Sequence, residues 1–320
     1  KVPREEAGRA FLEFLSRYLI TESKTHRRRL IGNGHILLNG SAGPTMRRVS
    51  AGDTVSLPAD VDMAGPPPQQ MELEVIHYGP DHLCIDKPPG VPVLPGRGGE
   101  GAEFYESLVA LLNRDAPEGG PYERPHVVHR LDKETSGVLL VARNVQAGRK
   151  LSKQFQNRDV VKSYMALVEG PFPRESLEID IPLAREKGSV VRMRTVQRKG
   201  KAASTRVQVA ERFEHFTLLR VEPHTGRQHQ IRVHLAAVGY PLVVDHLYGL
   251  RKELTADDLS RIMGRDAHGA HGVLLDRLPL HAQSITYADP TTGNETCQSA
   301  PLPQDLEGIL ALLRELDAPA

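Results

Sequence analysis

The sequence predicts an α+β protein in which a mixed, mostly antiparallel sheet with flanking helices follows a small N-terminal α/β module. Three observations predict this class. The 320 residues are enough for two domains of about 150 residues each. Three consecutive prolines, at residues 66–68, interrupt the chain after the first module. Beyond them, many short alternating or β-branched stretches and few helical ones favour antiparallel pairing.

The first 58 residues predict a compact unit of two helices and two short strands. Apolar residues between positions 11 and 20 recur every three or four residues, as on one face of an amphipathic helix. Ser23 is a candidate cap for a second, basic helix, which two glycines end. Short strands are expected at residues 35–38 and 54–57.

A linker and a larger second domain follow. Residues 59–70 are rich in proline, cannot pack a core and are expected to be a linker. Residues 71–320 are expected to form the main domain. Its expected strands cover residues 72–77, 82–86, 137–143, 160–168, 190–196, 203–210 and 215–222. Its expected helices cover residues 103–113, 145–158 and 228–238.

The net charge of +1 conceals an uneven distribution along the chain. Residues 1–58 hold ten Lys/Arg against five Asp/Glu, whereas residues 251–320 hold six against eleven. A surface that faces a polyanion is therefore expected in the N-terminal module. A charged face that only contacts solvent is the alternative explanation.

Composition excludes several classes of protein. Two cysteines, Cys84 and Cys297, are too few for a disulfide framework or a cysteine-based zinc site, which fits a reducing cytoplasm. No apolar run of about 18 residues is present, so no membrane partner is expected. The first residues carry no apolar signal core.

Asp132 stands where a polar loop enters an apolar strand. Aspartate is rarely buried unless it is paired. The structural alternative is a carboxylate that caps a turn or pairs with Arg130 or Lys133.

A second polar segment supplies a possible partner for this carboxylate. Arg232 lies between two apolar residues, and a partly buried arginine needs an acid. A carboxylate paired with it would stay ionised, as a nucleophile must. The neighbouring histidines, His224, His229 and His234, are spaced five residues apart rather than four, so no metal site is expected.

These segments resemble the RluA-type pseudouridine synthases of ribosomal and transfer RNA. The resemblance covers about residues 71–312. Its three main segments are His129-Arg130-Leu131-Asp132-x-x-Thr135-Ser136-Gly137, Lys162-Ser163-Tyr164-Met165-Ala166-Leu167-Val168 and Thr225-Gly226-Arg227-x-His229-Gln230-Ile231-Arg232-Val233-His234. It also includes Asp245-x-x-Tyr248-Gly249, Leu280-His281-Ala282 and Pro301-Leu302-Pro303. The N-terminal module separately resembles an S4-like RNA-binding domain, through Ser23-x-x-x-x-Arg28 and Leu37-Leu38-Asn39-Gly40.

The resemblance implies a cofactor-free isomerase with Asp132 as its catalytic aspartate. The bond from uracil nitrogen to ribose breaks, the ring turns, and ring carbon 5 joins the sugar. Attack on ring carbon 6, attack on the anomeric carbon, and a glycal route all remain open.

The resemblance also implies roles for other residues. Arg232 pairs with the aspartate, Tyr164 stacks on the base and helps move its proton, and Arg130 fills the gap that the flipped base leaves. Lys87 would shape the site or bind phosphate, and Arg227 would orient its loop or contact phosphate. Further substrate contacts are expected from His129 and Ile231. RNA binding by the N-terminal module is expected from Lys24, Arg27, Arg28 and Arg29.

The RNA target is expected to be large-subunit ribosomal RNA, because relatives with such a module act there, and the protein is expected to be a cytoplasmic monomer. The alternatives are a transfer RNA substrate, a non-catalytic RNA-binding protein of ribosome assembly, and a metal-dependent hydrolase acting on RNA. The sequence differs from the family's usual residues at Gln228, Val244 and residues 94–96. These differences bear on which RNA is modified and leave the reaction class unchanged. Residues 251–276 are expected to be an insertion.

Overall fold

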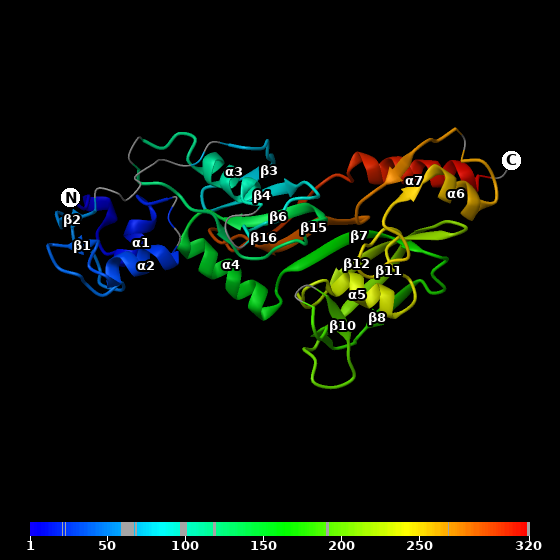
Figure 1. The fold of residues 1–320 in the computed structure, drawn as a ribbon, viewed down its shortest axis with the longest axis horizontal. Coiled ribbons are helices and arrows are strands. Elements are labelled where there is room, and N and C mark those ends of the chain that lie inside the picture. Colours follow the sequence, from blue (N-terminus) through cyan, green and yellow to red (C-terminus); the bar gives the residue numbers. More distant parts are fainter. Residues whose placement is uncertain are drawn as a thin grey trace. The chain divides into compact units, whose positions relative to one another are not determined.

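The computed structural model folds into two compact units, which Figure 1 shows as a ribbon. One unit comprises residues 1–72 and 94–126, and the other comprises residues 73–93 and 127–320. The described residues are 1–20, 22, 24–58, 67, 69–96, 101–117, 120–189, 192–267 and 269–318. The predicted cap Ser23 and most of the predicted linker lie outside them.

The first unit contains the helices and strands that the N-terminal sequence predicts. Helices α1 (Phe11–Ser16) and α2 (Lys24–Gly32) follow the 3-10 helix η1 (Arg4–Glu6), and β1 (Leu37–Leu38) pairs antiparallel with β2 (Val55–Ser56). Their apolar faces share one core, because the three-to-four-residue spacing places these side chains on the same side of each helix. The core includes Phe11, Leu15, Leu19, Leu30, Ile31, Ile36 and Leu38.

Residues 94–126, which were expected in the second domain, belong to this first unit. They contain α3 (Glu103–Leu112). The Arg124 guanidinium donates hydrogen bonds to the Ser16 and Leu19 carbonyls at 2.9 and 3.0 Å. Val109 and Tyr122 share a small apolar cluster with Ile20. The boundary predicted at residue 70 therefore does not coincide with that of the compact unit.

The second unit is organised around a large sheet. Its strands run in the order β3 (Glu74–Tyr78), β4 (His82–Lys87), β6 (Ser136–Ala142), β15 (Leu280–Ala288), β7 (Val161–Glu169), β12 (Phe216–Pro223), β11 (Thr205–Arg212) and β8 (Ser176–Ile179). β16 (Glu295–Ser299) pairs with β15 outside this order. β5 (His126–Val127) pairs with β6. β6 and β15 pair parallel, and the other neighbours in the order above, together with β15 and β16, pair antiparallel. The predicted α+β class with a mixed, mostly antiparallel sheet is confirmed.

Helices cover two parts of this sheet. α4 (Val145–Asn157) packs Ala147 and Leu151 against side chains of β6 and β15. α6 (Ala256–Met263) and α7 (Gln304–Asp317), drawn in orange-yellow and red in Figure 1, share a core with β7 and β12. The remaining elements are α5 (Gln230–Ala237), the hairpin of β9 (Leu183–Arg185) and β10 (Met193–Thr195), and the pair β13 (Leu254–Thr255) and β14 (Val273–Leu275).

Residues 251–276, which the sequence predicts to be an insertion relative to the family, contribute several side chains to the core. Leu254, Leu259 and Met263 are buried in the cluster that α7 completes. α6 begins with a capping box in which the side chains of Thr255 and Asp258 satisfy each other's backbone amides. No helix in the described part of the chain is long and apolar enough to cross a membrane.

Candidate active site

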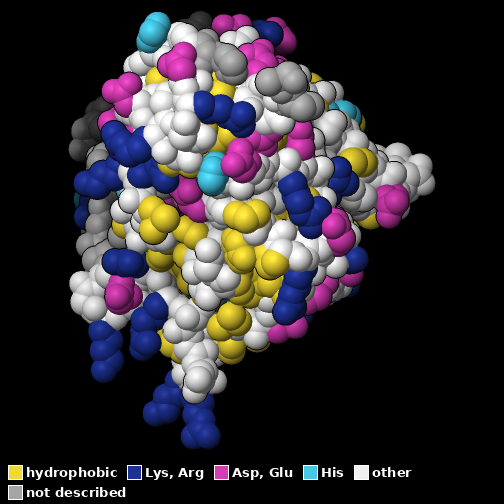
Figure 2. Space-filling view, turned by 90° about the vertical axis from the view of Figure 1, so that its right-hand side faces the viewer, with side chains coloured by type: hydrophobic (Ala, Val, Ile, Leu, Met, Phe, Trp, Pro, Cys, Tyr) yellow, Lys and Arg dark blue, Asp and Glu magenta, His cyan; other side chains and the backbone are white. Residues whose placement is uncertain are grey.

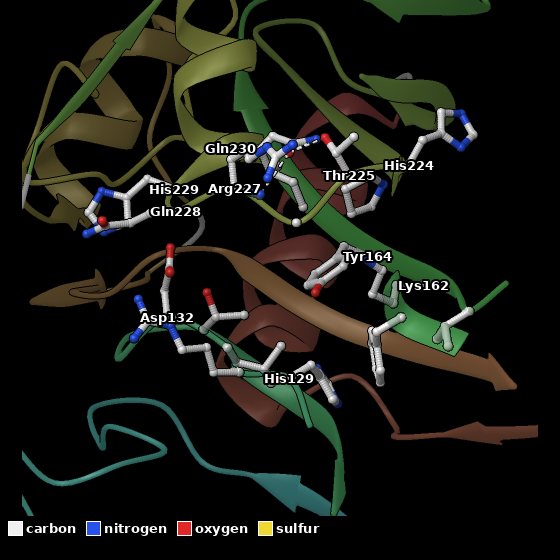
Figure 3. Close-up of a pocket in the computed structure, with 18 of the residues that line it drawn as sticks. His129, Asp132, Lys162, Tyr164, His224, Thr225, Arg227, Gln228, His229 and Gln230 are labelled. Atoms are coloured by element: carbon white, nitrogen blue, oxygen red, sulfur yellow. Dashed lines mark hydrogen bonds between the residues drawn. The ribbon is translucent and has the colours of Figure 1, made fainter. Parts of the chain in front are cut away.

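A cavity of about 510 Å³ opens in the second unit, and its wall is formed by Leu280 of β15 and four longer segments. The four segments are residues 128–135, the C-terminal end of α4 with Arg158, the start of β7, and residues 223–232. Figure 3 shows Asp132 and Tyr164 projecting into this hollow from different elements, with His229 above Asp132. A cavity of this size suits a small ligand or a single nucleoside.

Asp132 lies in the loop that precedes β6, and the sequence of that loop fixes its position. The Thr135 amide donates to the Asp132 carbonyl at 3.1 Å, which closes a tight turn. The strand begins beside Gly137, whose φ is 109°. A Cβ there would lie 2.2 Å from the Ala282 carbonyl oxygen, so only glycine allows β6 to approach β15. The Asp132 side chain remains 28% exposed and faces the cavity.

His129 stabilises this loop. Its Nε2 accepts a hydrogen bond from the Leu140 amide at 2.9 Å, and its ring stacks on Phe155. Burial, together with the nearby charge of Lys162, lowers the pKa of His129 to about 3, so the ring is neutral as the accepting nitrogen requires. The residue lines the cavity, but its polar contact is to the protein backbone rather than toward a substrate.

Lys87 stabilises the same loop through hydrogen bonds to backbone carbonyls. Its side chain is fully buried, and its Nζ donates to the carbonyls of Pro88, Val91 and Lys133 at 2.6, 2.9 and 3.1 Å. Burial lowers the pKa of Lys87 to about 7. Because three carbonyls occupy the three donors of the ammonium, Lys87 shapes the loop. The phosphate contact that the sequence left open does not fit this geometry.

Tyr164 reaches the cavity from β7, between Ala282 of β15 and Val221 of β12. Its ring is buried. Burial raises the pKa of the phenol, and the negative charge of Asp132 raises it further. The hydroxyl therefore stays protonated near neutral pH, where it can donate a hydrogen bond or a proton.

Arg232, on α5, contacts two carboxylates, which is one more than the sequence predicted. Its Nη1 lies 3.7 Å from Oδ2 of Asp132, so the expected ion pair is present. Its Nε and Nη2 donate to Asp245 at 2.7 and 2.6 Å. Burial opposes the charge of Arg232, but the bonds to Asp245 outweigh burial and its pKa is raised. Asp245 is thus the main partner, and sequence reasoning noted it only within a family motif.

The segment before α5 is held by a residue that the sequence analysis did not single out. The buried Gln230 amide accepts from the Thr225 hydroxyl and the Arg227 amide, and it donates to the Ser204 carbonyl and the Thr205 hydroxyl. Arg227 Nε also donates to the Ala202 carbonyl, which agrees with its expected role in orienting the loop. The available signal in the sequence was its place in the segment Thr225-Gly226-Arg227-x-His229-Gln230, because burial cannot be read from a residue letter.

The other expected substrate contacts line the cavity with different exposure. Arg130 is exposed at its rim, and Ile231 is buried in its wall. The combination of a half-exposed carboxylate, a protonated phenol and an exposed guanidinium can support attack on a bound base or sugar together with proton transfer. Among the described residues, no group of three or more His, Cys, Asp or Glu is placed to hold a metal ion.

The N-terminal cations differ from one another. Lys24, Arg28 and Arg29 are exposed on α2, as an RNA-binding role requires. Arg27 departs from this expectation, because it is buried and donates to the Leu19 and Glu22 carbonyls. Burial lowers the pKa of Arg27 to about 10. We therefore treat Arg27 as part of the fold rather than of a binding surface.

A basic hairpin, which the sequence analysis missed, lies beside the cavity segment of α5. Residues 185–201 contain seven Lys/Arg and one Glu. All seven cations are exposed: Arg185, Lys187, Arg192, Arg194, Arg198, Lys199 and Lys201. Figure 2 shows Lys and Arg side chains projecting at the lower end of the view, where Figure 1 places the loop below β10. Such a concentration of exposed charge suits a polyanion.

Comparison with known proteins agrees with this site. Residues 81–237 match the family described as RNA pseudouridylate synthase. The chain is 34% identical to an uncharacterised RNA pseudouridine synthase of Bacillus subtilis, over 92% of this chain and 90% of that protein. It is 35% identical to the ribosomal large subunit pseudouridine synthase D of Xanthomonas campestris, over 100% of this chain and 93% of that protein.

A solved structure is also similar. Human RNA pseudouridylate synthase domain containing 4 superposes with a TM-score of 0.58 at 28% identity, covering 75% of this chain and 93% of that one. The matched family segment contains Asp132, Tyr164 and Arg232 and ends with α5.

Proposed function

Because the chain belongs to the RNA pseudouridine synthases, we propose that it isomerises specific uridines of large-subunit ribosomal RNA, with Asp132 as the catalytic carboxylate. The observation that carries this assignment is the meeting of Asp132, Tyr164 and Arg232 at one cavity. The three come from separate segments of the chain, and each supplies a group that the isomerisation needs.

The reaction consumes no co-reactant because every atom of uridine is kept. The bond between N1 of the base and the sugar breaks, and a bond from C5 to the sugar forms. The proton on C5 leaves, and N1 gains one. Asp132 supplies the carboxylate, acting at the ring or at the sugar, and the protonated Tyr164 serves the proton transfer. Arg130, exposed at the rim, would occupy the place of the flipped base.

Two surfaces support a large, structured RNA as the substrate. The seven exposed cations of residues 185–201 lie in the unit that holds the cavity, and Lys24, Arg28 and Arg29 lie in the other unit. We propose that residues 1–58 are an S4-like RNA-binding domain and that residues 71–320 hold the catalytic function. The large-subunit synthase of Xanthomonas campestris aligns with all of this chain, its N-terminal module included, which favours a ribosomal target over transfer RNA. The monomeric state and the cytoplasmic location stay predictions.

The test is tritium release from RNA labelled at C5 of uridine. Transcripts of large-subunit ribosomal RNA and of transfer RNA are incubated separately with the full chain. We expect release from the ribosomal transcript, and loss of release in Asp132→Ala. The matched control is Asp266→Ala, which removes an exposed carboxylate outside the cavity and should leave release unchanged.

The outcomes separate the parts of the proposal. Unchanged release by Asp132→Ala would refute the role of this carboxylate. Release from transfer RNA alone would show that the substrate is transfer RNA and not ribosomal RNA. Sequencing that maps pseudouridine in total RNA, with and without the gene, would then identify the modified position.

A further inference from the structure

The Arg232 guanidinium is shared unequally between two acids. Asp245 receives the fork formed by Nε and Nη2, at 2.7 and 2.6 Å, whereas Asp132 faces the remaining Nη1 at 3.7 Å. A bidentate arginine–carboxylate pair is both strong and directional. The orientation of Arg232 is therefore set by Asp245, which lies outside the segments that line the cavity.

Asp245 is also held in place by contacts other than the one with Arg232. Its side chain is 1% exposed, and its Oδ1 accepts from the amides of Leu247 and Tyr248 at 2.8 and 3.0 Å. The turn is closed by Gly249, where a Cβ would lie 2.9 Å from the Asp245 backbone. Burial opposes ionisation, but the bonds from Arg232 and from these amides lower the pKa of Asp245. It is a fixed negative charge.

Tyr248 completes the support on the other side of the guanidinium. The Arg232 guanidinium carbon lies 5.0 Å from the centre of the Tyr248 ring. The Tyr248 hydroxyl accepts from the Met193 amide in β10 at 2.8 Å and lies 2.9 Å from Nδ1 of His229. The guanidinium thus has an acid along one edge and a ring against one face, which leaves Nη1 directed at Asp132.

We propose that Asp245 is a positioning residue for the isomerisation, which holds the Arg232 fork so that it does not close on Asp132. This inference rests on the proposed function. If the fork turned to Asp132, both oxygens of that carboxylate would be engaged and neither would be free for the uridine. With Asp245 as the main partner, Arg232 offers Asp132 only its Nη1, at 3.7 Å, and Asp132 stays open to the cavity.

The test replaces Asp245→Asn in the full chain. Asparagine keeps the shape and the oxygen that accepts from Leu247 and Tyr248, but it loses the charge that holds the fork. At saturating RNA we expect the single-turnover rate of tritium release to fall by about tenfold to a hundredfold, the cost of a small misplacement of reacting groups. RNA affinity, measured by filter binding, should change by less than about twofold, because Asp245 does not reach the cavity.

The molecule offers a control for the loss of an arginine–carboxylate fork. Arg277 donates through Nε and Nη2 to Asp305 at 2.5 and 2.6 Å, and neither residue lines the cavity. The Asp305 side chain is 37% exposed, whereas that of Asp245 is 1% exposed. Asp305→Asn breaks the same kind of fork. We expect it to lower thermal stability less than Asp245→Asn does, because its carboxylate is partly exposed, while the saturated rate of tritium release stays at the parent value.

A double substitution tests whether Asp245 acts through Arg232. In an Arg232→Gln background, Asp245→Asn should cause no further loss of rate, because the residue it positions is gone. Full additivity of the two losses, or a saturated Asp245→Asn rate equal to the parent's, would overturn the inference while leaving the proposed function intact. A parent chain that releases no tritium would instead overturn the proposed function, and this inference with it.

Discussion

Tyr164 is the residue whose chemistry depends most on its neighbours. A tyrosine in a predicted strand also has a purely structural explanation, because β-strands favour aromatic residues. In the sheet it is buried between β15 and β12, and its hydroxyl enters the cavity that Asp132 also lines. Burial and the charge of Asp132 both raise the pKa of the phenol. Tyr164 therefore stays protonated and can act as an acid.

The substitution Tyr164→Phe separates the ring from the hydroxyl. The ring can still stack on a base, so RNA affinity should be kept. We expect the saturated rate of tritium release to fall by about a hundredfold or more, the usual value of a positioned acid or base. Because the raised pKa keeps Tyr164 protonated, the parent rate should not rise between pH 7 and pH 9 through ionisation of this residue. The control is Tyr240→Phe, outside the cavity-lining set.

Single residues also mark the limit of prediction from sequence. The sequence identified Asp132, Tyr164 and Arg232 because each lies in a recognisable segment. It did not separate Lys87 and Arg27 from exposed cations, since burial and carbonyl partners leave no mark in the residue letters. The pairing of Asp245 with Arg232 could not be predicted either, because the turn that directs this carboxylate to Arg232 is seen only in the folded structure.

At the scale of elements, local patterns predicted β4, β6, β7 and α4 to within one or two residues of their observed bounds. The strand that completes the centre of the sheet, β15, was not predicted. It lies between β6 and β7 in the sheet but follows them by more than a hundred residues in the chain. Pairing over such distances depends on the whole fold rather than on local periodicity.

The junction of β6 and β15 gives a prediction at this scale. Gly137→Ala places a Cβ 2.2 Å from the Ala282 carbonyl oxygen at a φ of 109°. We expect the free energy of unfolding in urea to fall by about 2–4 kcal/mol, because the strands must separate and the backbone is strained. Tritium release should also fall, since this residue ends the loop that carries Asp132.

Its control is Gly308→Ala on the exposed side of α7, where a Cβ meets nothing within 4 Å. That variant should gain about 0.5–1 kcal/mol through better helix propensity. A Gly137→Ala chain as stable as the parent would contradict the tight strand approach.

For the whole molecule, charge is distributed by unit and by segment rather than evenly. The N-terminal 58 residues carry ten Lys/Arg against five Asp/Glu, and residues 185–201 carry seven against one. The final seventy residues are acidic, with six against eleven. A protein with a net charge of only +1 can therefore offer RNA two concentrated basic segments, one in each compact unit.

Replacing Lys24, Arg28 and Arg29 by Gln tests the N-terminal segment in the intact chain. Each cation that contacts phosphate releases counterions, so the slope of log affinity against log salt should weaken by about 0.7–0.9 per residue, or about 2–3 in total. The KM for RNA should rise while the saturated rate stays constant, because the chemistry lies in the other unit. Arg27→Met should instead lower stability without changing the slope, since its guanidinium is buried on carbonyls. An unchanged slope in the triple variant would remove RNA binding from α2.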